Sequence, residues 1–293
     1  DWSSDVCSSD LANRDASSGT MKGAVFILMM NADHSVQSVH KIAPSQGGFT
    51  GTLITDGYFG HSVAAIGDLD NDGIPDIAVG NFNDDDGASN AGAIWILFLN
   101  SNGTVKSHQK ISASQGNFTA ILDADDQFGR SIACLGDVDR DGVTDLAVGA
   151  RNDDDGITNA GAAYVLFLKT DGTVKAHQKI SRTQGGLSYI PSGNSRFGES
   201  ICGLGDLNGD GTPDMLLGGL TAATSGMMAV LLLNPDGTVK SDKVHINTPG
   251  TPEIDSQDLW GQGLTCVGDL NGDGYADVLA GAPGDDDGHS AAG

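Results

Sequence analysis

Short oxygen-bearing side chains recur four times along the chain at one fixed spacing. Each copy reads D-x-[DN]-x-D-G-x-x-D, so positions 1, 3, 5 and 9 carry a carboxylate or an amide. Alternate short side chains of this kind can curl around one hard cation, and the glycine at position 6 allows the sharp turn that follows. The side chains are Asp68, Asp70, Asp72 and Asp76; Asp137, Asp139, Asp141 and Asp145; Asp206, Asn208, Asp210 and Asp214; and Asp269, Asn271, Asp273 and Asp277. We call these segments Asp loops 1 to 4, and the pattern predicts a metal ion in each.

A backbone carbonyl at position 7 is expected to complete each cage of ligands. The residues at this position are Ile74, Val143, Thr212 and Tyr275. A set of about six oxygens suits Ca²⁺, so we expect one structural calcium ion in each of the four Asp loops. With no cation, several carboxylates held this close together would repel one another. The alternative interpretation is an acidic turn that binds no metal.

The Asp loops differ from EF-hand loops in two respects. An EF-hand supplies a bidentate glutamate at position 12 and is flanked by helices. Position 12 is Val79, Val148, Leu217 or Ala280 in the four copies, and the flanking residues have the pattern of strands. Each predicted ligand set must therefore close within nine residues.

Aspartate dominates the charge of the chain. The formal net charge is −24, and Glu199 and Glu253 are the two glutamates among the acidic residues. Aspartate is suited to turns and tight oxygen cages, whereas glutamate favours helices. So negative a chain repels phosphate backbones and anionic lipids, which argues against a nucleic-acid partner. No apolar run reaches the roughly 20 residues that cross a bilayer, so we expect no membrane insertion.

A repeat of about 69 residues organises the chain. Phe59-Gly60, Phe128-Gly129 and Phe197-Gly198 recur every 69 residues, and Trp260-Gly261 follows after 63. Each period contains four candidate strands, with the Asp loop between the first two. The third strand, such as residues 94–99, is apolar on both faces, which is typical of a sheet packed between two others. The repeat predicts an all-β fold, a β-propeller of four-stranded antiparallel blades.

The repeat also predicts where blades begin and end. We expect a partial blade with strands three and four at 12–58, complete blades at 59–127, 128–196 and 197–259, and a partial blade with strands one and two at 260–293. Three complete blades are too few for the usual propeller, so more blades are expected outside this fragment. Residues 1–11 resemble a translated sequencing adapter and are set aside. The gene is then expected to be cut on its 5′ side, where a secretion signal would lie.

Phe-Gly, the nine-residue Asp loop and the triplet Gly281-Ala282-Pro283 together resemble the FG-GAP repeat of the integrin α-subunit propeller. The resemblance implies a seven-bladed propeller, calcium in the loop between strands one and two, and a role in cell adhesion. Gly80-Asn81-Phe82 and Gly149-Ala150-Arg151 depart from the Gly-Ala-Pro triplet. The near-identity of the copies is similar to FG-GAP arrays of bacterial surface and secreted proteins.

Three functions are compatible with these features. The first is an extracellular or cell-surface binding and adhesion module that presents loops to a protein or glycan ligand. The second is the propeller part of a secreted polysaccharide-active enzyme with catalytic residues outside this fragment. The third is a structural array without a ligand. Every polar cluster here is copied, whereas catalysis needs a unique constellation, so we expect no catalytic or cofactor-binding residues and no enzyme in this fragment.

A second acidic motif follows the second strand of several repeats. It reads D-D-D-G, and its copies are 84–87, 153–156 and 285–288. We call these copies the DDDG segments. They are interpreted either as solvated turns or as weaker cation sites. The third complete repeat shortens this connection, so a blade can form without it.

Overall fold

The computed structural model describes residues 21–220, 226–246 and 258–285. Every regular element in these residues is a β-strand, which confirms the predicted all-β class. Within the same residues, no helix is long and apolar enough to cross a membrane. The scarcity of helix agrees with a chain that is rich in aspartate and glycine, because neither residue favours a helix interior.

The described residues form sixteen strands in five sheets, and neighbouring strands in each sheet are consecutive in the chain. The three four-stranded sheets are β3–β6, β7–β10 and β11–β14, and the two-stranded sheets are β1–β2 and β15–β16. The strands are β1 Val25–Met30, β2 Val36–Ile42, β3 Val63–Gly67, β4 Asp76–Asn81, β5 Ala93–Leu99, β6 Val105–Ser112, β7 Phe128–Gly136, β8 Asp145–Ala150, β9 Ala162–Leu168, β10 Val174–Ile180, β11 Ser200–Gly205, β12 Asp214–Gly219, β13 Met227–Leu233, β14 Val239–His245, β15 Gly263–Gly268 and β16 Asp277–Gly281.

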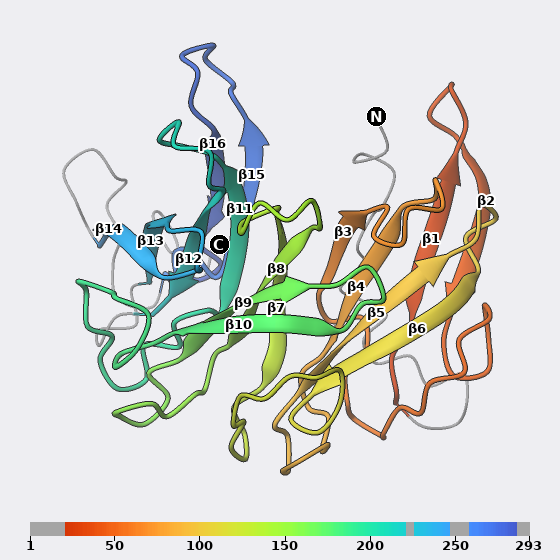
Figure 1. Ribbon diagram of the computed structural model, residues 1–293, viewed down its shortest axis with the longest axis horizontal. Helices are drawn as coiled ribbons and strands as arrows, with labels where there is room; N and C mark the ends of the chain where they lie inside the picture. Colours follow the sequence, from red (N-terminus) through yellow and green to blue (C-terminus); the bar gives the residue numbers. More distant parts are fainter. Residues whose placement is uncertain (1–20, 221–225, 247–257, 286–293) are drawn as a thin grey trace. The chain divides into compact units, whose positions relative to one another are not determined.

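The chain divides into two compact units. Among the described residues, one unit comprises 21–132 and 168–176, and the other comprises 133–167, 177–220, 226–246 and 258–285. Figure 1 shows β3, β4, β5 and β6 of the first unit side by side in that order. The pairings β3–β4, β4–β5 and β5–β6 are all antiparallel, as are β11–β12, β12–β13 and β13–β14 in the second unit. These meanders match the predicted blade design.

The two middle strands of each four-stranded sheet are the most deeply buried. All seven residues of β5 are buried, and so are all seven of β9. In the first unit, Val25 and Ile27 of β1 share one apolar cluster with Ile77 of β4 and Trp95 of β5. The sheets β1–β2 and β3–β6 therefore pack face to face, which explains why the third strand is apolar on both faces.

The recurring Phe-Gly pair ties each sheet to the start of the next repeat. Gly92 forms an isolated parallel bridge with Phe128, whose side chain is fully buried. Gly92 has φ +95°, and a Cβ there would lie 2.1 Å from the carbonyl oxygen of Phe128. This close approach requires glycine. The same bridge joins Gly23 to Phe59, Gly161 to Phe197 and Gly226 to Trp260.

A tight hairpin turn joins β5 to β6. In the dipeptide Asn102-Gly103, only Gly103 takes a positive φ, of +76°. The N–H of Gly103 donates to the carbonyl of Asn100 at 2.8 Å, and the β5–β6 register shifts beside the turn. This is a three-residue turn with a left-handed glycine and a bulge. The side chain of Asn102 instead accepts the N–H of Thr104 at 3.1 Å.

Candidate metal centres

Each Asp loop connects the first two strands of its sheet. Loop 1 joins β3 to β4, loop 2 joins β7 to β8, loop 3 joins β11 to β12, and loop 4 joins β15 to β16. Position 9 is the first residue of the second strand in every copy. The sheet therefore fixes the last predicted ligand, while the other positions lie on the loop.

The position 1 aspartate folds the loop around its own carboxylate. Asp68 accepts the N–H of Asp72 on Oδ1 at 2.9 Å and the N–H of Gly73 on Oδ2 at 2.8 Å. Asp72 in turn accepts the N–H of Ile74 at 2.8 Å. The same three bonds occur in loops 2, 3 and 4. The four loops thus share one backbone shape, as their common spacing predicts.

The position 9 aspartate is the buried anchor of the loop. Asp76 is fully buried and accepts the N–H groups of Leu69 and Leu99, each at 3.0 Å. Burial raises the pKa of Asp76 to about 6, the two backbone bonds oppose this, and the charges of Asp70 and Asp72 add to it. A carboxylate that is costly to ionise beside two others is a place where a divalent cation is stabilising.

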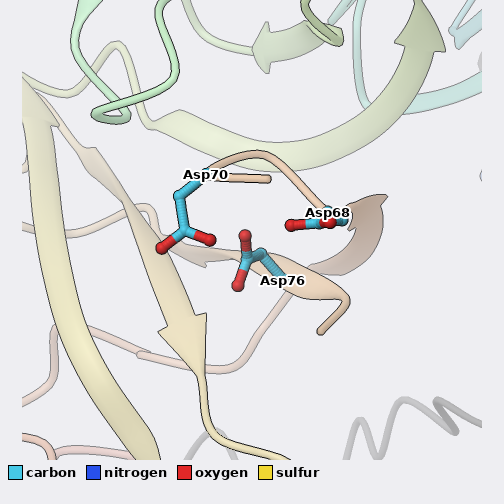
Figure 2. A group of neighbouring side chains, drawn as sticks. All are labelled: Asp68, Asp70 and Asp76. Carbon is cyan, nitrogen blue, oxygen red and sulfur yellow. The ribbon is translucent and has the colours of Figure 1, made fainter. Parts of the chain in front are cut away.

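The carboxylates of loop 1 converge. Figure 2 shows those of Asp68, Asp70 and Asp76 turned toward one another, and one oxygen of each lies within 4.8 Å of the other two. Asp137, Asp139 and Asp145 of loop 2 form the equivalent group. The Oδ1 atom of Asp70 is buried and has no hydrogen-bond partner among the residues that the structure describes. A buried, unsatisfied carboxylate oxygen fits a cation ligand, because leaving it unpaired would otherwise be costly.

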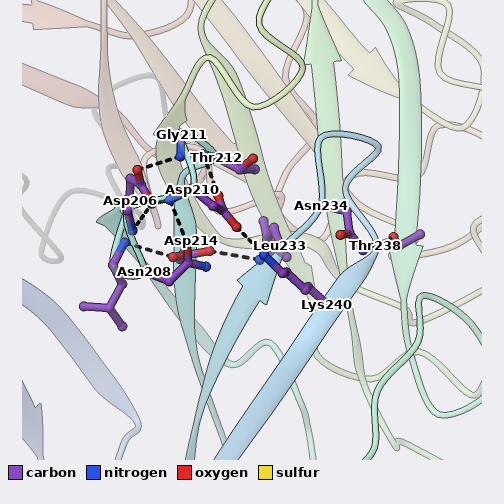
Figure 3. A network of polar contacts seen from close by, with 12 residues as sticks. Asp206, Asn208, Asp210, Gly211, Thr212, Asp214, Leu233, Asn234, Thr238 and Lys240 are labelled. Carbon is purple, nitrogen blue, oxygen red and sulfur yellow. Dashed lines mark hydrogen bonds and ion pairs between the residues drawn. The ribbon is translucent and has the colours of Figure 1, made fainter.

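Loops 3 and 4 carry an amide at position 3 in place of a carboxylate. In loop 3, Asp214 accepts the N–H groups of Leu207 and Leu233, both at 2.9 Å, and burial raises its pKa (Figure 3). In loop 4, the backbone bond from Gly274 is the main cause that lowers the pKa of Asp269. Both loops keep the oxygen-only donor set that calcium prefers, with one negative charge fewer.

The position 5 aspartate of loop 1 lies outside the converging group. Asp72 instead binds the ammonium group of Lys106, which also contacts Asp70 Oδ2 at 2.5 Å. The bond to Lys106 is the main cause that lowers the pKa of Asp72. Lys106 lies outside the nine-residue pattern of the Asp loop. The recurring dipeptides Val105-Lys106, Val174-Lys175 and Val239-Lys240 were a usable signal.

The DDDG segments are satisfied by the chain's own donors. Lys110 contacts Asp84 at 2.7 Å, and Asp86 accepts bonds from Ser112, Ser114 and Gln115. The second copy repeats this arrangement with Lys179 and Asp153 at 2.7 Å, and with Ser181, Thr183 and Gln184 around Asp155. These contacts favour a structural cluster of ion pairs and hydrogen bonds over a cation site. We call this cluster the clasp. Residues 286–288 of the last copy lie outside the described residues.

Comparison with known proteins identifies the repeat. The family model of the FG-GAP repeat matches residues 59–97 and 128–166, and that of the FG-GAP-like repeat matches residues 206–280. Each match includes one Asp loop or more. The chain is therefore an FG-GAP-repeat protein with an integrin-like β-propeller fold.

Integrin α subunits are among the relatives of the chain. Integrin alpha-2 of Mus musculus is 33% identical over 178 residues, which is 58% of this chain and 14% of the relative. Integrin alpha-3 of Cricetulus griseus is 30% identical over 199 residues, or 68% of this chain and 17% of the relative. Integrin alpha-7 of Homo sapiens is 29% identical over 230 residues, 78% of this chain and 17% of the relative. The similarity thus spans less than a fifth of each relative.

Proposed function

We propose that this chain is a calcium-stabilised extracellular ligand-binding module, which acts in cell-surface adhesion and is not itself an enzyme. The observation that carries the proposal is the converging group of Asp68, Asp70 and Asp76, in which the buried Oδ1 of Asp70 has no hydrogen-bond partner within the described part of the chain. The FG-GAP similarity to integrin α subunits supports the same function. In the family that the chain resembles, such propellers serve adhesion. We also propose that the blades have the boundaries 12–58, 59–127, 128–196, 197–259 and 260–293.

Calcium is the cation that fits the donor set. All predicted side-chain ligands are oxygens, and the residues present offer three or four carboxylates to each Asp loop. Asp68, Asp70, Asp72 and Asp76, with the carbonyl of Ile74, would hold the ion in loop 1. The ion would neutralise the carboxylates and tie the first strand to the second. The other three loops would use the corresponding residues.

Ligand contact is assigned to the end of the blade opposite the Asp loop. The turns at the two ends of β4 lie at opposite ends of the antiparallel sheet, so the DDDG end faces away from the predicted metal. A cavity of about 690 Å³ opens there in the first unit, and Thr52, Asp85, Trp95 and His108 are among its lining residues. A wall that mixes an aromatic ring with hydrogen-bonding groups suits a protein loop or a glycan.

Calcium titration and thermal unfolding test the metal part of the proposal. The chain with Ca²⁺ at about 100 times its dissociation constant is expected to gain about 2.7 kcal/mol for each filled loop relative to the chain in EGTA. Isothermal titration calorimetry should give a stoichiometry near four. Equal midpoints in calcium and EGTA, with no binding heat, would contradict it.

A binding screen tests the ligand part. Immobilised chain should capture a glycan or an extracellular protein in calcium, and the substitution Thr52→Arg, which places a large charged group in the cavity wall, should weaken that capture. Leu279→Arg on β16 is a control, because this residue is exposed and lies outside the cavity. Capture that ignores calcium and Thr52→Arg would count against the assignment of this end.

A further inference from the structure

A lysine follows a valine at the start of the fourth strand in every complete repeat. The pairs are Val105-Lys106, Val174-Lys175 and Val239-Lys240, while Gln37 follows Val36 in the first, partial repeat. Leu99 pairs with Val105 on one side and donates its N–H to Asp76 on the other. The start of β6 is therefore at the same end of the sheet as Asp loop 1. Lys106 reaches the loop of its own blade from this position.

The ammonium groups bind carboxylate oxygens at predicted metal-ligand positions. Lys106 contacts Asp70 Oδ2 at 2.5 Å and also binds Asp72, at positions 3 and 5 of loop 1. Lys240 contacts Asp210 Oδ2 at 2.7 Å, at position 5 of loop 3 (Figure 3). By contrast, the position 1 aspartates of these loops accept backbone N–H groups. Asp72 and Asp210 at position 5 also accept one backbone N–H each, but on Oδ1. The lysines bind the Oδ2 atoms of these carboxylates.

We propose that Lys106 and Lys240 are tethered competitors of the cation, and that they set how tightly loops 1 and 3 bind calcium. This inference rests on the proposed calcium function. Without an ion, the ammonium group relieves repulsion among the carboxylates of its loop. With an ion, the same positive charge opposes binding, because the cation needs oxygens that the lysine holds. The lysine therefore stabilises the metal-free chain and weakens the site at the same time.

The strength of this competition differs between loops. Lys106 binds two carboxylates of loop 1, whereas Lys240 binds one carboxylate of loop 3. In the part of loop 4 that the structure describes, no lysine contact accompanies Asp273. Removal of Lys106 should therefore have a larger effect on calcium affinity than removal of Lys240.

The test compares Lys106→Gln and Lys240→Gln with a matched control, Lys243→Gln. Glutamine already occupies this strand position at Gln37, so the fold accommodates it. Lys243 is exposed on the same strand as Lys240, three residues away, and no ion pair joins it to an Asp loop among the described residues. Its substitution therefore removes one charge only. Calcium affinity is measured by isothermal titration calorimetry, and stability by thermal melts in EGTA and in saturating calcium.

Lys106→Gln should bind calcium at loop 1 roughly tenfold tighter than the unchanged chain. In EGTA the same variant should melt about 1–3 °C lower, because a pair that neutralises the loop is gone. The two effects have opposite signs. A lysine with a purely structural role would lower stability in both conditions and would not tighten binding. Lys243→Gln should change neither quantity measurably.

A second variant assigns the effect to loop 1. In an Asp68→Asn background, which weakens loop 1, Lys106→Gln should no longer tighten any calcium binding. The proposal is overturned if the unchanged chain binds calcium and Lys106→Gln binds it with equal or lower affinity, and the proposed function then stands. If no variant binds calcium, the proposed function fails together with this inference.

Discussion

Asp loop 1 and the DDDG segment 84–87 lie at opposite ends of β4, and their carboxylates have different surroundings. Asp loop 1 brings one oxygen of each of three carboxylates within 4.8 Å of the others, and none of the described residues donates a hydrogen bond to the buried Oδ1 of Asp70. In the DDDG segment, Lys110 reaches the side chain of Asp84, which is only 2% exposed, and three side-chain donors surround Asp86. Both segments are rich in aspartate. They differ in the supply of donors from the rest of the chain.

The difference shows that two segments of similar acidic density can differ in how far the chain's own donors satisfy their carboxylates. Strand β6 supplies the lysine at both segments. Lys106 lies near its start, and Lys110 follows four residues later. At the DDDG end the lysine is itself mostly buried, with 10% of its side chain exposed, whereas Lys106 is 35% exposed. A buried ion pair is costly to break, while an exposed one is exchanged at little cost. We infer that the first is structural and that the second can yield to an ion.

The largest expected effect is at the clasp. Lys110→Met should lower the free energy of unfolding by about 3–5 kcal/mol, because the buried carboxylate of Asp84 loses its cation. Urea denaturation in EGTA measures this loss. Lys243→Met is the control and should leave the free energy of unfolding almost unchanged.

The same variant sharpens the comparison through calcium. If the DDDG segment is only a clasp, Lys110→Met leaves the calcium stoichiometry and affinity unchanged, provided that the measurement is made where the variant is folded. An additional calcium ion bound by Lys110→Met, or one lost, would show that the two segments are not different in kind.

The next effect concerns the anchor of the Asp loop. Asp76→Ala removes the acceptor of two buried N–H groups, from Leu69 and Leu99, and should cost about 2–4 kcal/mol in EGTA. Asp76→Asn keeps one acceptor oxygen and should cost about half as much. Asp214→Ala removes the same pair of bonds in the second unit and serves as a replicate. If Asp76→Ala left the free energy of unfolding in EGTA unchanged, the aspartate would serve only as a metal ligand.

Much of this fold follows from local sequence. The 69-residue period and third strands that are apolar on both faces predict stacked antiparallel sheets, and β5 and β9 are buried along their whole length. Hydrogen bonding within each Asp loop is also local, since it joins residues two to seven positions apart. Such contacts repeat wherever the spacing repeats.

The lysine contacts could not be read from the same local pattern. Lys106 and Lys110 lie 26 to 36 positions from their carboxylate partners, so the sheet must form before they meet. One signal was nevertheless present. In the third complete repeat, where the DDDG segment is missing, Val244 replaces the second lysine, four residues after Lys240. Because the second lysine and the DDDG segment are missing from the same repeat, the sequence predicts that they are partners.

A smaller effect distinguishes the two segments by pH. Burial would raise the pKa of Asp86, but bonds from Ser112, Ser114 and Gln115 outweigh it and lower the pKa to about 2. A carboxyl whose pKa is lower in the folded chain stabilises it above its ordinary pKa of 3.8, and that stability is lost as the pH falls toward 2.

The substitution Asp86→Asn isolates this contribution. It should cost about 1 kcal/mol at pH 7 and flatten the loss of stability between pH 4 and pH 2, because no carboxyl remains to be protonated. Urea midpoints in EGTA at several pH values measure both. Curves for the variant and the unchanged chain that run parallel through this range would contradict the assignment.

The smallest effect tests whether charge or oxygen count defines the Asp loop. Asp70→Asn copies the amide that loops 3 and 4 already carry as Asn208 and Asn271. It should change stability in EGTA by about 0.5 kcal/mol or less and weaken calcium at loop 1 by roughly threefold to tenfold, with the stoichiometry kept. Asp85→Asn removes one charge at the DDDG end and should leave calcium affinity unchanged. Loss of one bound ion in Asp70→Asn would mean that four carboxylates are required, and that loops 3 and 4 do not hold calcium.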